Sequence, residues 1–423
     1  MSERTGFDLT VIGLGYVGMP LAKEATAAGL RVAGLDVDPR KVEALNAGQS
    51  YIDDLTDADL DAMLAGGFTA TLDASVLAES RTIVICVPTP LDEDHRPDLS
   101  AVEGATRAVA QHLRPGTLVV LESTTWPGTT DEVARPILEG AGLAAGTDFH
   151  LAFSPERIDP GNTKYGLRNT PKVVGGYTVA CRDRAAAFYS QFVEWVVPVS
   201  GTREAEMAKL LENTYRHVNI ALVNEMAIFC DELGINLWEA IEAASTKPFG
   251  FQKFLPGPGV GGHCIPVDPS YLSYTVRKLG YPFRFVELAQ EINERMPSYV
   301  VARAQRLLNR ARKPVNGSRV LLLGVTYKPD IADERETPAV PVAEALLELG
   351  AEIVFCDPHV KEWAVKGNQI PRANDLAAAV ADADITLLLQ QHSAFDLGVV
   401  EERAQLVLDT RGVLATSDRV ERL

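Results

Sequence analysis

The chain has little cysteine, no long apolar run and no excess of basic residues. Its cysteines are odd in number, widely spaced and free of any CxxC pair: Cys86, Cys181, Cys230, Cys264 and Cys356. This pattern argues against a disulfide framework or a zinc site, and it predicts no bound metal and a reducing cytoplasm as location. No run of about 18 apolar residues occurs, so no membrane partner is expected. The first residues, "MSERTGFDLT", contain no signal-peptide core.

Acidic residues outnumber basic ones by 57 to 40, which gives a formal net charge of -17. Because phosphate backbones need a basic face, nucleic acid is not an expected partner. A small anionic ligand is still compatible with this charge, since a few local cations and backbone N–H groups can bind it. With 423 residues, of which 46% are hydrophobic, the chain is long enough for two or three globular domains.

Short apolar runs alternate with helical patterns in the N-terminal half, as in "DLTVIGLG", "LRVAGLDVD", "RTIVICVP" and "GTLVVLES". The same alternation returns near the C-terminus in "RVLLLGVTYK", "AEIVFCDPHV", "ADITLLLQQH" and "AQLVLDTRG". Such runs predict parallel strands joined by crossover helices. We therefore predict an α/β fold with two Rossmann-like, doubly wound domains, residues 1–202 and 297–423, joined by a central helical domain, residues 203–296.

A long helix is predicted for "TREAEMAKLLENTYRHVNIALVNEMAIFCDELG", where apolar residues recur at spacings of three and four. It is long for a globular helix. A helix of this length between two α/β halves indicates a connecting element and a dimerisation surface, or only a spacer. The sequence leaves these alternatives open.

The first apolar run leads into a glycine-rich loop, "VIGLGYVG", with the spacing G-x-G-x-x-G. In such loops the glycines allow a tight turn, close approach of a pyrophosphate and close helix packing. Asp36 ends the next strand, where a carboxylate accepts from ribose hydroxyls and repels a 2′-phosphate, so NAD is favoured over NADP. The alternative is a glycine-rich turn without a ligand. The predicted cofactor-binding residues here are Gly13, Gly15, Tyr16, Val17, Gly18 and Asp36, with Pro88 and Thr89 on the nicotinamide side.

A second unusual loop is "GPGVGGHCIPVDPSYL", residues 257–272, which places Cys264 four residues before Asp268. A thiolate that adds to an aldehyde forms a thiohemiacetal, which can lose hydride to give a thioester that water hydrolyses. Asp268 is suited to act as base or to orient that water. The alternative is a buried structural thiol, which is common for cysteine.

Six segments in order resemble the NAD-dependent UDP-sugar 6-dehydrogenases, the UDP-glucose/UDP-mannuronic acid dehydrogenase family. They are "VIGLGYVGMPLA", "ESTTWPGTT", "FSPERIDPGN", "AEMAKLLENTYRHVNIALVNE", "GPGVGGHCIPVDP" and "LLLGVTYKPDIADERETPA". The resemblance implies oxidation of the C6 hydroxyl of a nucleotide-diphosphate sugar to a carboxylate, with two NAD⁺. It also implies a homodimer or larger homo-oligomer and a role in supplying uronic acids for polysaccharide biosynthesis.

By position, the resemblance implies that Cys264 is the nucleophile and Asp268 its acidic partner. Lys209 and Asn213 match residues that hold the C6 oxygen and a water, and they share one helix face because they are four residues apart. Thr124 matches a residue that binds the same water, and Glu156 one implicated in base chemistry. Taken alone, Lys209 would be a solvated lysine and Glu156 a turn residue. Whether Asp268 or Glu156 is the hydrolytic base is left open.

The resemblance also supplies ligand contacts. The implied substrate-binding residues are Lys209, Asn213, Lys253, Gly261 and Lys328, and Arg335 is implied to reach the dinucleotide. A Lys/Arg pair is suited to bind diphosphates. His263 has the status of an ordinary loop histidine.

The sequence departs from many UDP-glucose dehydrogenases in two places. A second Glu four residues after Glu156 is replaced by Pro160, and no Lys precedes Asp268 in "CIPVD". The forms "ESTTWPGTT", "SPERIDPGN" and "TKPFGF" are closer to the branch that acts on UDP-GlcNAc and UDP-ManNAc. UDP-glucose or dTDP-glucose is the alternative substrate. Two other classes compete: a nucleotide-sugar-binding protein without activity, and a 6-phosphogluconate or 3-hydroxy acid dehydrogenase, which needs no reactive cysteine.

Overall fold

The computed structural model describes residues 6–423 apart from 53, 54, 93–96, 160, 163, 263, 264 and 266. Two predicted residues, Cys264 and His263, therefore lie outside the described residues. The chain divides into two compact units. The first unit comprises Met1–Glu212 and Ser270–Gly280, and the second unit comprises Asn213–Pro269 and Tyr281–Leu423.

The first unit contains an eight-stranded sheet in the order β3-β2-β1-β4-β5-β6-β7-β8. The strands are β1 (Phe7–Ile12), β2 (Val32–Leu35), β3 (Thr69–Thr71), β4 (Ser80–Ile85), β5 (Leu118–Leu121), β6 (His150–Phe153), β7 (Lys172–Gly176) and β8 (Val196–Pro198). Strand β1 is central, since Leu9 pairs with Val32 on one side and Thr82 on the other. The prediction of parallel strands is confirmed for the four quoted runs, which form β1, β2, β4 and β5. Strands β6 and β7, which were not predicted, run antiparallel to each other.

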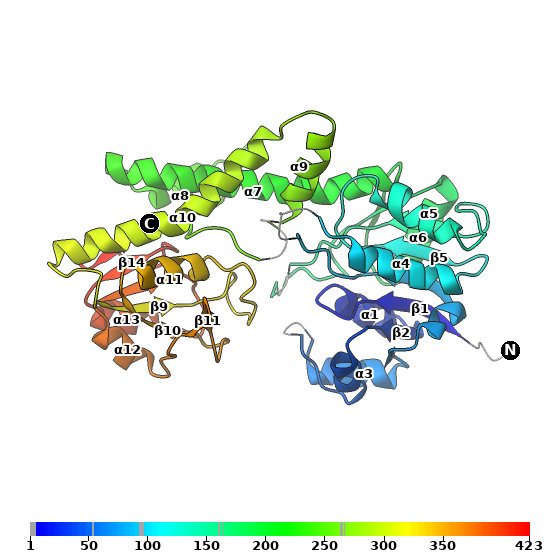
Figure 1. Cartoon of the computed structure of the whole chain (residues 1–423), viewed down its shortest axis with the longest axis horizontal. Helices are drawn as coiled ribbons and strands as arrows, with labels where there is room; N and C mark the ends of the chain where they lie inside the picture. The colour runs from blue at the N-terminus through cyan, green and yellow to red at the C-terminus, as the bar shows by residue number, and fades with distance from the viewer. Residues whose placement is uncertain are drawn as a thin grey trace. The chain divides into compact units, whose positions relative to one another are not determined.

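Helices cover both faces of this sheet (Figure 1). They are α1 (Gly18–Ala27), α2 (Pro39–Asn46), α3 (Asp57–Ala65), α4 (Ser100–His112), α5 (Arg135–Glu139) and α6 (Val179–Tyr189), with a π-helical turn at Thr130–Ala134 before α5. Side chains alternate along each strand, so Val84 packs with α1 and α6 while Ile83 packs with α4 and α5. The two faces thus have separate cores, as the doubly wound prediction requires.

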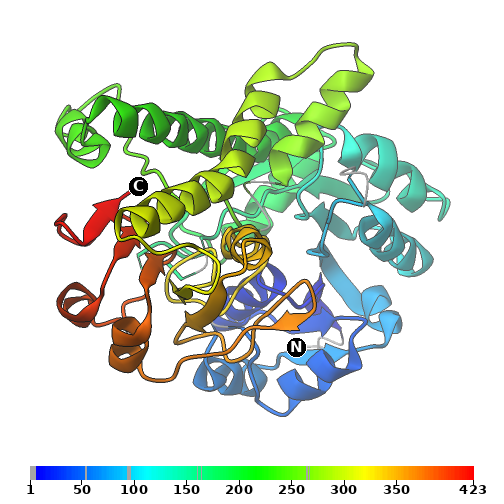
Figure 2. The same ribbon diagram turned by 60° about the vertical axis from the view of Figure 1, so that its left-hand side comes forward.

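The second unit contains a five-stranded parallel sheet in the order β10-β9-β13-β14-β15. Its strands are β9 (Arg319–Leu323), β10 (Glu352–Cys356), β13 (Ile385–Leu388), β14 (Val407–Asp409) and β15 (Val420–Arg422), with a separate hairpin of β11 (Ala364–Val365) and β12 (Asn368–Gln369). Helices α10 (Arg284–Arg310) and α11 (Ala339–Glu348) pack on one face. Helices α12 (Leu376–Asp382) and α13 (Leu397–Arg403) pack on the other (Figure 2).

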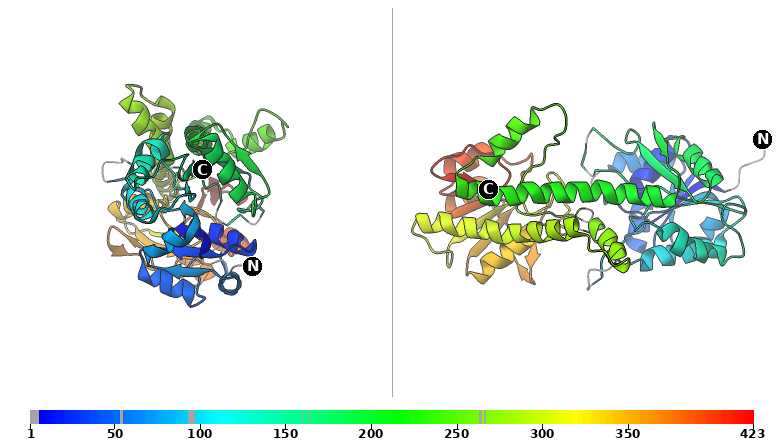
Figure 3. Two further views of the ribbon diagram at one scale, coloured as in Figure 1. Left: turned by 90° about the vertical axis from the view of Figure 1, so that its right-hand side faces the viewer. Right: turned by 90° about the horizontal axis from the view of Figure 1, so that it is seen from above.

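The predicted long helix is confirmed as α7 (Thr202–Leu233), followed by α8 (Leu237–Ser245) and α9 (Asp268–Lys278). Helix α10 lies beside the C-terminal half of α7, as Figure 3 shows. Asn224 of α7 donates to Asn293 of α10 at 2.9 Å, and Asp231 pairs with Arg303 at 3.1 Å. Since α10 continues to Arg310, the predicted domain boundary at residue 296 falls inside a helix. Among the described residues, no helix combines the length and the hydropathy needed to cross a membrane.

Candidate functional site

The glycine-rich loop after β1 has the geometry that a dinucleotide needs. Gly13 has φ +93°, and a Cβ on it would lie 2.7 Å from the carbonyl oxygen of Cys86. A Cβ on Gly18 would lie 2.0 Å from the carbonyl oxygen of Gly13, so these two glycines are required by packing. A Cβ on Gly15 would meet nothing within 4 Å. The second glycine therefore borders open space, where a pyrophosphate can approach the backbone and the start of α1.

Asp36 lies at the end of β2, next to this loop. Its carboxylate accepts from the backbone N–H of Leu14 at 2.8 Å and of Asp38 at 3.0 Å, and the Lys41 ammonium is 3.6 Å away. The carboxylate is thus fixed at the position where a ribose hydroxyl would donate to it. Tyr16 and Val17 are half-buried in the turn into α1. The residues present fit NAD.

Pro88 and Thr89 follow β4 with different exposure. Pro88 is exposed, whereas Thr89 is buried. The backbone oxygen of Thr89 accepts from the hydroxyl of Tyr271, so Thr89 is fixed from the side of α9. The loop that is predicted to line the nicotinamide side is held in place within the first unit.

Lys209 and Glu156 meet in the first unit. The Lys209 ammonium donates to the backbone oxygen of Glu156 at 2.7 Å and lies 3.4 Å from its carboxylate. Lys209 is 6% exposed and Glu156 is 9% exposed, so Lys209 is not a solvated lysine. The Glu156 carboxylate also accepts from the backbone N–H of Ile158, so the turn role is present as well. Thr124 is half-buried just beyond β5.

Asn213 and Asp268 meet in the second unit. The side-chain amide of Asn213 donates to the Asp268 carboxylate at 2.5 Å, and the two residues are 5% and 2% exposed. Asp268 is the first residue of α9. The predicted acidic partner is therefore fixed by α7, while the position of Cys264 lies outside the described residues.

The glycines before Cys264 have a packing role that the sequence interpretation missed. Of these glycines, Gly261 is predicted as a substrate contact. A Cβ on Gly261 would lie 2.6 Å from both the Tyr327 Cβ and the Glu336 backbone oxygen, and Gly262 donates to the Arg335 backbone oxygen at 3.1 Å. Gly261 therefore allows close contact with residues 327–336, the segment that follows β9.

The start of the same loop is held by amide side chains. The N–H of Gly257 donates to Asn224 at 2.9 Å, and Asn224 in turn donates to Asn293. Both asparagines are buried. Within the second unit, α7 thus binds the loop at Gly257 and, through Asn213, at Asp268.

Arg411 is a candidate ligand-binding residue that the sequence interpretation missed. It follows β14, and its Nε donates to the Leu389 backbone oxygen at 2.6 Å. A Cβ on Gly257 would lie 3.3 Å from its guanidinium. Burial lowers the pKa of Arg411 to about 10, which Asp409 opposes, so the side chain is still cationic at neutral pH. No ion pair joins its guanidinium to a carboxylate of the described residues; the sequence signal was "LDTRG", an Arg directly after a strand.

Two of the remaining predicted cations, Arg335 and Lys253, pair with nearby carboxylates. The Arg335 guanidinium forms a bidentate pair with Asp333, with distances of 2.8 and 2.5 Å. Lys253 pairs with Glu242. Lys328 is half-buried after β9, and its backbone oxygen accepts from the Thr326 hydroxyl at 2.8 Å. These contacts do not by themselves support a ligand-binding role for Lys253 or Arg335, so their roles stay predictions.

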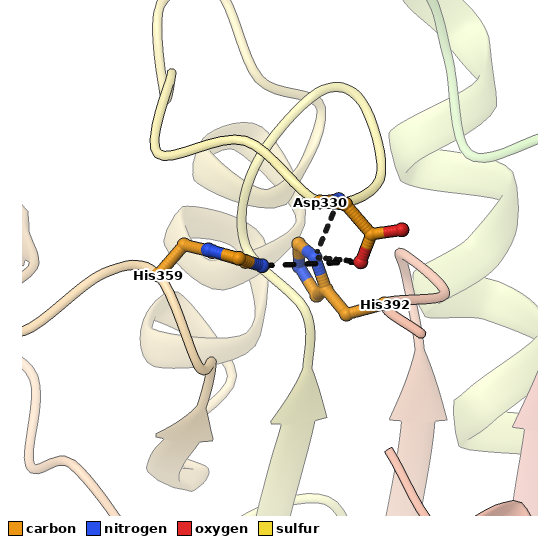
Figure 4. A group of neighbouring side chains, drawn as sticks. All are labelled: Asp330, His359 and His392. Carbon is orange, nitrogen blue, oxygen red and sulfur yellow. Dashed lines mark hydrogen bonds and ion pairs between the residues drawn. The ribbon is translucent and has the colours of Figure 1, made fainter. Parts of the chain in front are cut away.

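One other group of side chains has the composition of a metal site (Figure 4): Asp330, His359 and His392. His392 is buried, its Nδ1 accepts from the Asp330 backbone N–H at 3.0 Å, and its Nε2 lies 3.0 Å from the Asp357 carboxylate. Both ring nitrogens are therefore in use within the protein. We interpret the group as part of the packing after β9 and not as a metal site.

The chain matches three profiles of one family in order. They are the NAD binding domain, the central domain and the UDP binding domain of the UDP-glucose/GDP-mannose dehydrogenase family, at residues 7–193, 203–295 and 321–416. A UDP-N-acetyl-D-mannosamine dehydrogenase of Yersinia pestis is 36% identical over 424 residues, which cover 96% of this chain and 98% of the relative.

Two further proteins support the same relationship. An NDP-N-acetyl-D-galactosaminuronic acid dehydrogenase of Ralstonia nicotianae is 35% identical over 419 residues, which cover 96% of each chain. The solved structure of a UDP-D-ManNAc dehydrogenase from Pyrococcus horikoshii is similar with a TM-score of 0.88 at 32% identity, over 97% of this chain and 96% of that one.

Proposed function

Because the chain belongs to the UDP-glucose/GDP-mannose dehydrogenase family, we propose that it oxidises C6 of a UDP-N-acetylhexosamine to a carboxylate. The chain is an NAD-dependent nucleotide-sugar dehydrogenase. The relatives named as acting on N-acetylated sugars support the choice of substrate class. UDP-glucose and dTDP-glucose are the alternatives.

The observation that carries the proposal is the state of two polar residues on α7. Lys209 and Asn213 are buried and bind Glu156 and Asp268. Burial of a lysine and of an amide is costly unless each is hydrogen-bonded, and here each donates to its neighbour. These four residues are among the six that the family resemblance assigns to the chemistry.

We propose the following roles in the reaction. Lys209 and Asn213 bind the C6 oxygen, and the Lys209 charge stabilises the alkoxide or oxyanion that develops there. The Cys264 thiolate adds to the aldehyde carbon, which gives a thiohemiacetal and, after the second oxidation, a thioester. Thr124 and a carboxylate, Glu156 or Asp268, position and deprotonate the water that releases the product and the free thiol.

The cofactor would be held by residues of the first unit. Gly15 leaves the backbone open to the pyrophosphate, Gly13 and Gly18 allow the close packing of the turn and of α1, and Asp36 would accept from the ribose hydroxyls. When bound, NAD⁺ would supply the hydride acceptor for each of the two oxidations. The carboxylate of Asp36 would repel a 2′-phosphate, so NADP should be a poor substitute.

We place the nucleotide sugar in the second unit. Arg411, a cation with no carboxylate partner among the described residues, is proposed to bind an oxygen of the sugar or its diphosphate. Its proximity to Gly257 puts it next to the loop that carries Cys264 in sequence. Lys253, Gly261 and Lys328 remain proposed substrate contacts, and Arg335 a proposed cofactor contact.

We further propose that the protein is a homodimer through α7. Large apolar side chains on this helix are 40–66% exposed at spacings of four and seven residues: Met207, Leu211, Tyr215, Leu222, Phe229 and Leu233. A continuous apolar stripe of this kind is typical of a surface that a partner covers. Replacement of Leu211 and Leu222 by Glu should shift the mass measured by light scattering towards the monomer.

The proposed location is the cytoplasm. Cys86, Cys181, Cys230 and Cys356 are free thiols. A reaction that needs the thiolate of Cys264 is compatible with a reducing compartment, where thiols are not converted into disulfides.

The proposal is tested by NADH formation with purified protein, NAD⁺ and a panel of UDP-GlcNAc, UDP-ManNAc, UDP-GalNAc, UDP-glucose and dTDP-glucose. We expect the highest kcat/KM with one of the N-acetylated sugars. Cys264→Ser should bind NAD⁺ but complete no turnover. Higher efficiency with UDP-glucose or dTDP-glucose would establish the alternative substrate, and no NADH from any of the five would contradict the function.

A further inference from the structure

A buried ion pair that the proposed reaction does not use lies in the first unit. Lys172 is the first residue of β7, and its ammonium lies 2.9 Å from the carboxylate of Glu122, which follows β5. The two side chains are 3% and 1% exposed. Buried ion pairs are weak evidence for stability, because a well-packed apolar pair is often as stable. Stability alone therefore does not explain why this ion pair is buried at this position.

The pair is enclosed by α6. The hydroxyl of Tyr189 donates to the second oxygen of Glu122, and the Lys172 ammonium lies 5.2 Å from the centre of the Tyr189 ring. Burial and the neighbouring Glu122 charge raise the pKa of Tyr189 well above its usual value, so the hydroxyl keeps its proton and stays a donor. The Glu122 carboxylate thus has a fixed partner on each oxygen.

The same ammonium also reaches the segment that follows β6. It donates to the backbone oxygen of Pro155 at 3.2 Å, and Pro155 directly precedes Glu156. A second bond lies next to it, because the Ser154 hydroxyl donates to the backbone oxygen of Val173 at 2.8 Å. The start of β7 therefore fixes the residues on the N-terminal side of Glu156.

Glu122 lies in the same segment as a second residue of the proposed site, Thr124. It is two residues before Thr124, the residue proposed to bind the hydrolytic water. Through Glu122 and Pro155, one buried ammonium connects the segment of Thr124 with the segment of Glu156. Lys209 then contacts Glu156 at its backbone oxygen and its carboxylate.

We infer that Lys172 is a positioning residue, which places the Glu156 carboxylate relative to Lys209 and Thr124 during hydrolysis of the thioester. The inference rests on the proposed function. It follows that loss of the Lys172 ammonium should slow thioester hydrolysis more than the steps before it. A misplacement of about 1 Å in such a group typically costs about 100-fold in rate.

The test uses Lys172→Met and the double variant Lys172→Met with Glu122→Gln. The single variant leaves the Glu122 charge buried without its partner and is at risk of misfolding. The double variant removes both charges, and the oxygen of the introduced amide can still accept from Tyr189, so it should fold. A matched control is Arg303→Met, which removes a buried cation of the second unit that pairs with Asp231 and Glu421.

We expect the double variant to show a kcat lowered about 10- to 100-fold, with kcat/KM for NAD⁺ within about threefold of the unmodified protein, because the steps before hydrolysis are little changed. Mass spectrometry during turnover should show enzyme that carries the sugar as a covalent adduct at Cys264, because hydrolysis has become the slow step. Arg303→Met should melt earlier but accumulate no adduct.

The inference is overturned if the folded double variant accumulates no covalent adduct, or if Arg303→Met accumulates as much. Failure of the proposed function has a different signature. In that case the unmodified protein itself gives no oxidation of any nucleotide sugar, whatever the variants do.

Discussion

The two sheets of this protein begin with the same turn. After β1, Leu14 donates its N–H to Asp36 at 2.8 Å, and after β9, Val325 donates its N–H to Asp357, also at 2.8 Å. Each turn opens with a glycine at positive φ, and a Cβ on either glycine would collide with the backbone that follows the neighbouring strand, at 2.7 Å for Gly13 and 2.3 Å for Gly324. The same turn geometry therefore occurs twice in the chain.

The turns differ in the hydrogen-bond partners and the exposure of the aspartate. The Asp36 carboxylate has two backbone donors and a lysine at 3.6 Å, and it is 8% exposed. The Asp357 carboxylate is 1% exposed, accepts from three backbone N–H groups and is 3.0 Å from His392. The same fold element therefore leaves one aspartate available to a ligand and commits the other to packing. This difference teaches that the strand–turn–strand pattern alone does not establish a dinucleotide site.

The largest effect should come from the glycines that the two turns share. Gly13→Ala and Gly324→Ala should each lower the free energy of unfolding by about 3 kcal/mol or more, because positive φ and a backbone collision act together. Gly15→Ala should cost less than about 1 kcal/mol but raise KM for NAD⁺ about tenfold, since its Cβ would occupy the open space next to the loop. Denaturant unfolding measures the loss of stability, and NAD⁺ kinetics measure the change in KM. Equal losses of stability in all three variants would contradict the expected difference between Gly15 and the other two glycines.

Substitution of the two aspartates should distinguish an effect on NAD⁺ binding from an effect on stability. Asp357→Asn should lower the free energy of unfolding by about 2 kcal/mol, because an amide nitrogen would face buried N–H donors. It should leave KM for NAD⁺ unchanged. Asp36→Asn should have the smaller effect on stability and raise KM for NAD⁺ about tenfold, the loss expected for a charge-assisted hydrogen bond. The comparison fails if Asp357→Asn weakens NAD⁺ as much as Asp36→Asn does.

The smallest effect concerns pH, for which the two units should respond in opposite directions. Burial raises the pKa of Glu206 to about 7, although the N–H groups of Gly128 and Thr130 and the Thr130 hydroxyl oppose this. A raised carboxyl pKa contributes stability at low pH that is lost as pH rises through 7, so the first unit should lose about 1 kcal/mol between about pH 6 and 8. Glu206→Gln should remove this slope, and its persistence in that variant would contradict the assignment.

For Asp357 the sign is reversed. Burial opposes ionisation, but the hydrogen bond from His392, together with the backbone N–H groups, lowers the pKa of Asp357. Its contribution is therefore present above the ordinary carboxyl pKa and lost as pH falls through the lowered value. Acid unfolding of Asp357→Asn should accordingly depend less on pH than that of the unmodified protein.

The parts of the fold that the sequence predicted are those with a local signature. The strand runs, the loop of Gly13 to Gly18 and the length of α7 each depend on spacing within a single segment, and the structure confirms them. The family resemblance led to the four residues Lys209, Glu156, Asn213 and Asp268. The structure then shows Lys209 in contact with Glu156 and Asn213 in contact with Asp268. The roles of these residues stay predictions.

What the sequence did not reveal depends on contacts between distant segments. The antiparallel pairing of β6 with β7 and the pair of Glu122 with Lys172 arise only when the sheet assembles. Arg411 is one of many arginines until its distance from Gly257 is known. The close packing of Gly261 on Tyr327 could not be read from a glycine run, which is equally typical of a ligand-binding loop.

The most direct test of the central claim is the stoichiometry of the reaction. With a limiting amount of the preferred UDP-N-acetylhexosamine and excess NAD⁺, absorbance at the NADH band and product mass should be measured at completion. We predict about two NADH per sugar and a product that carries a carboxylate at C6, as two successive hydride transfers require. One NADH per sugar with an aldehyde as product would contradict the account.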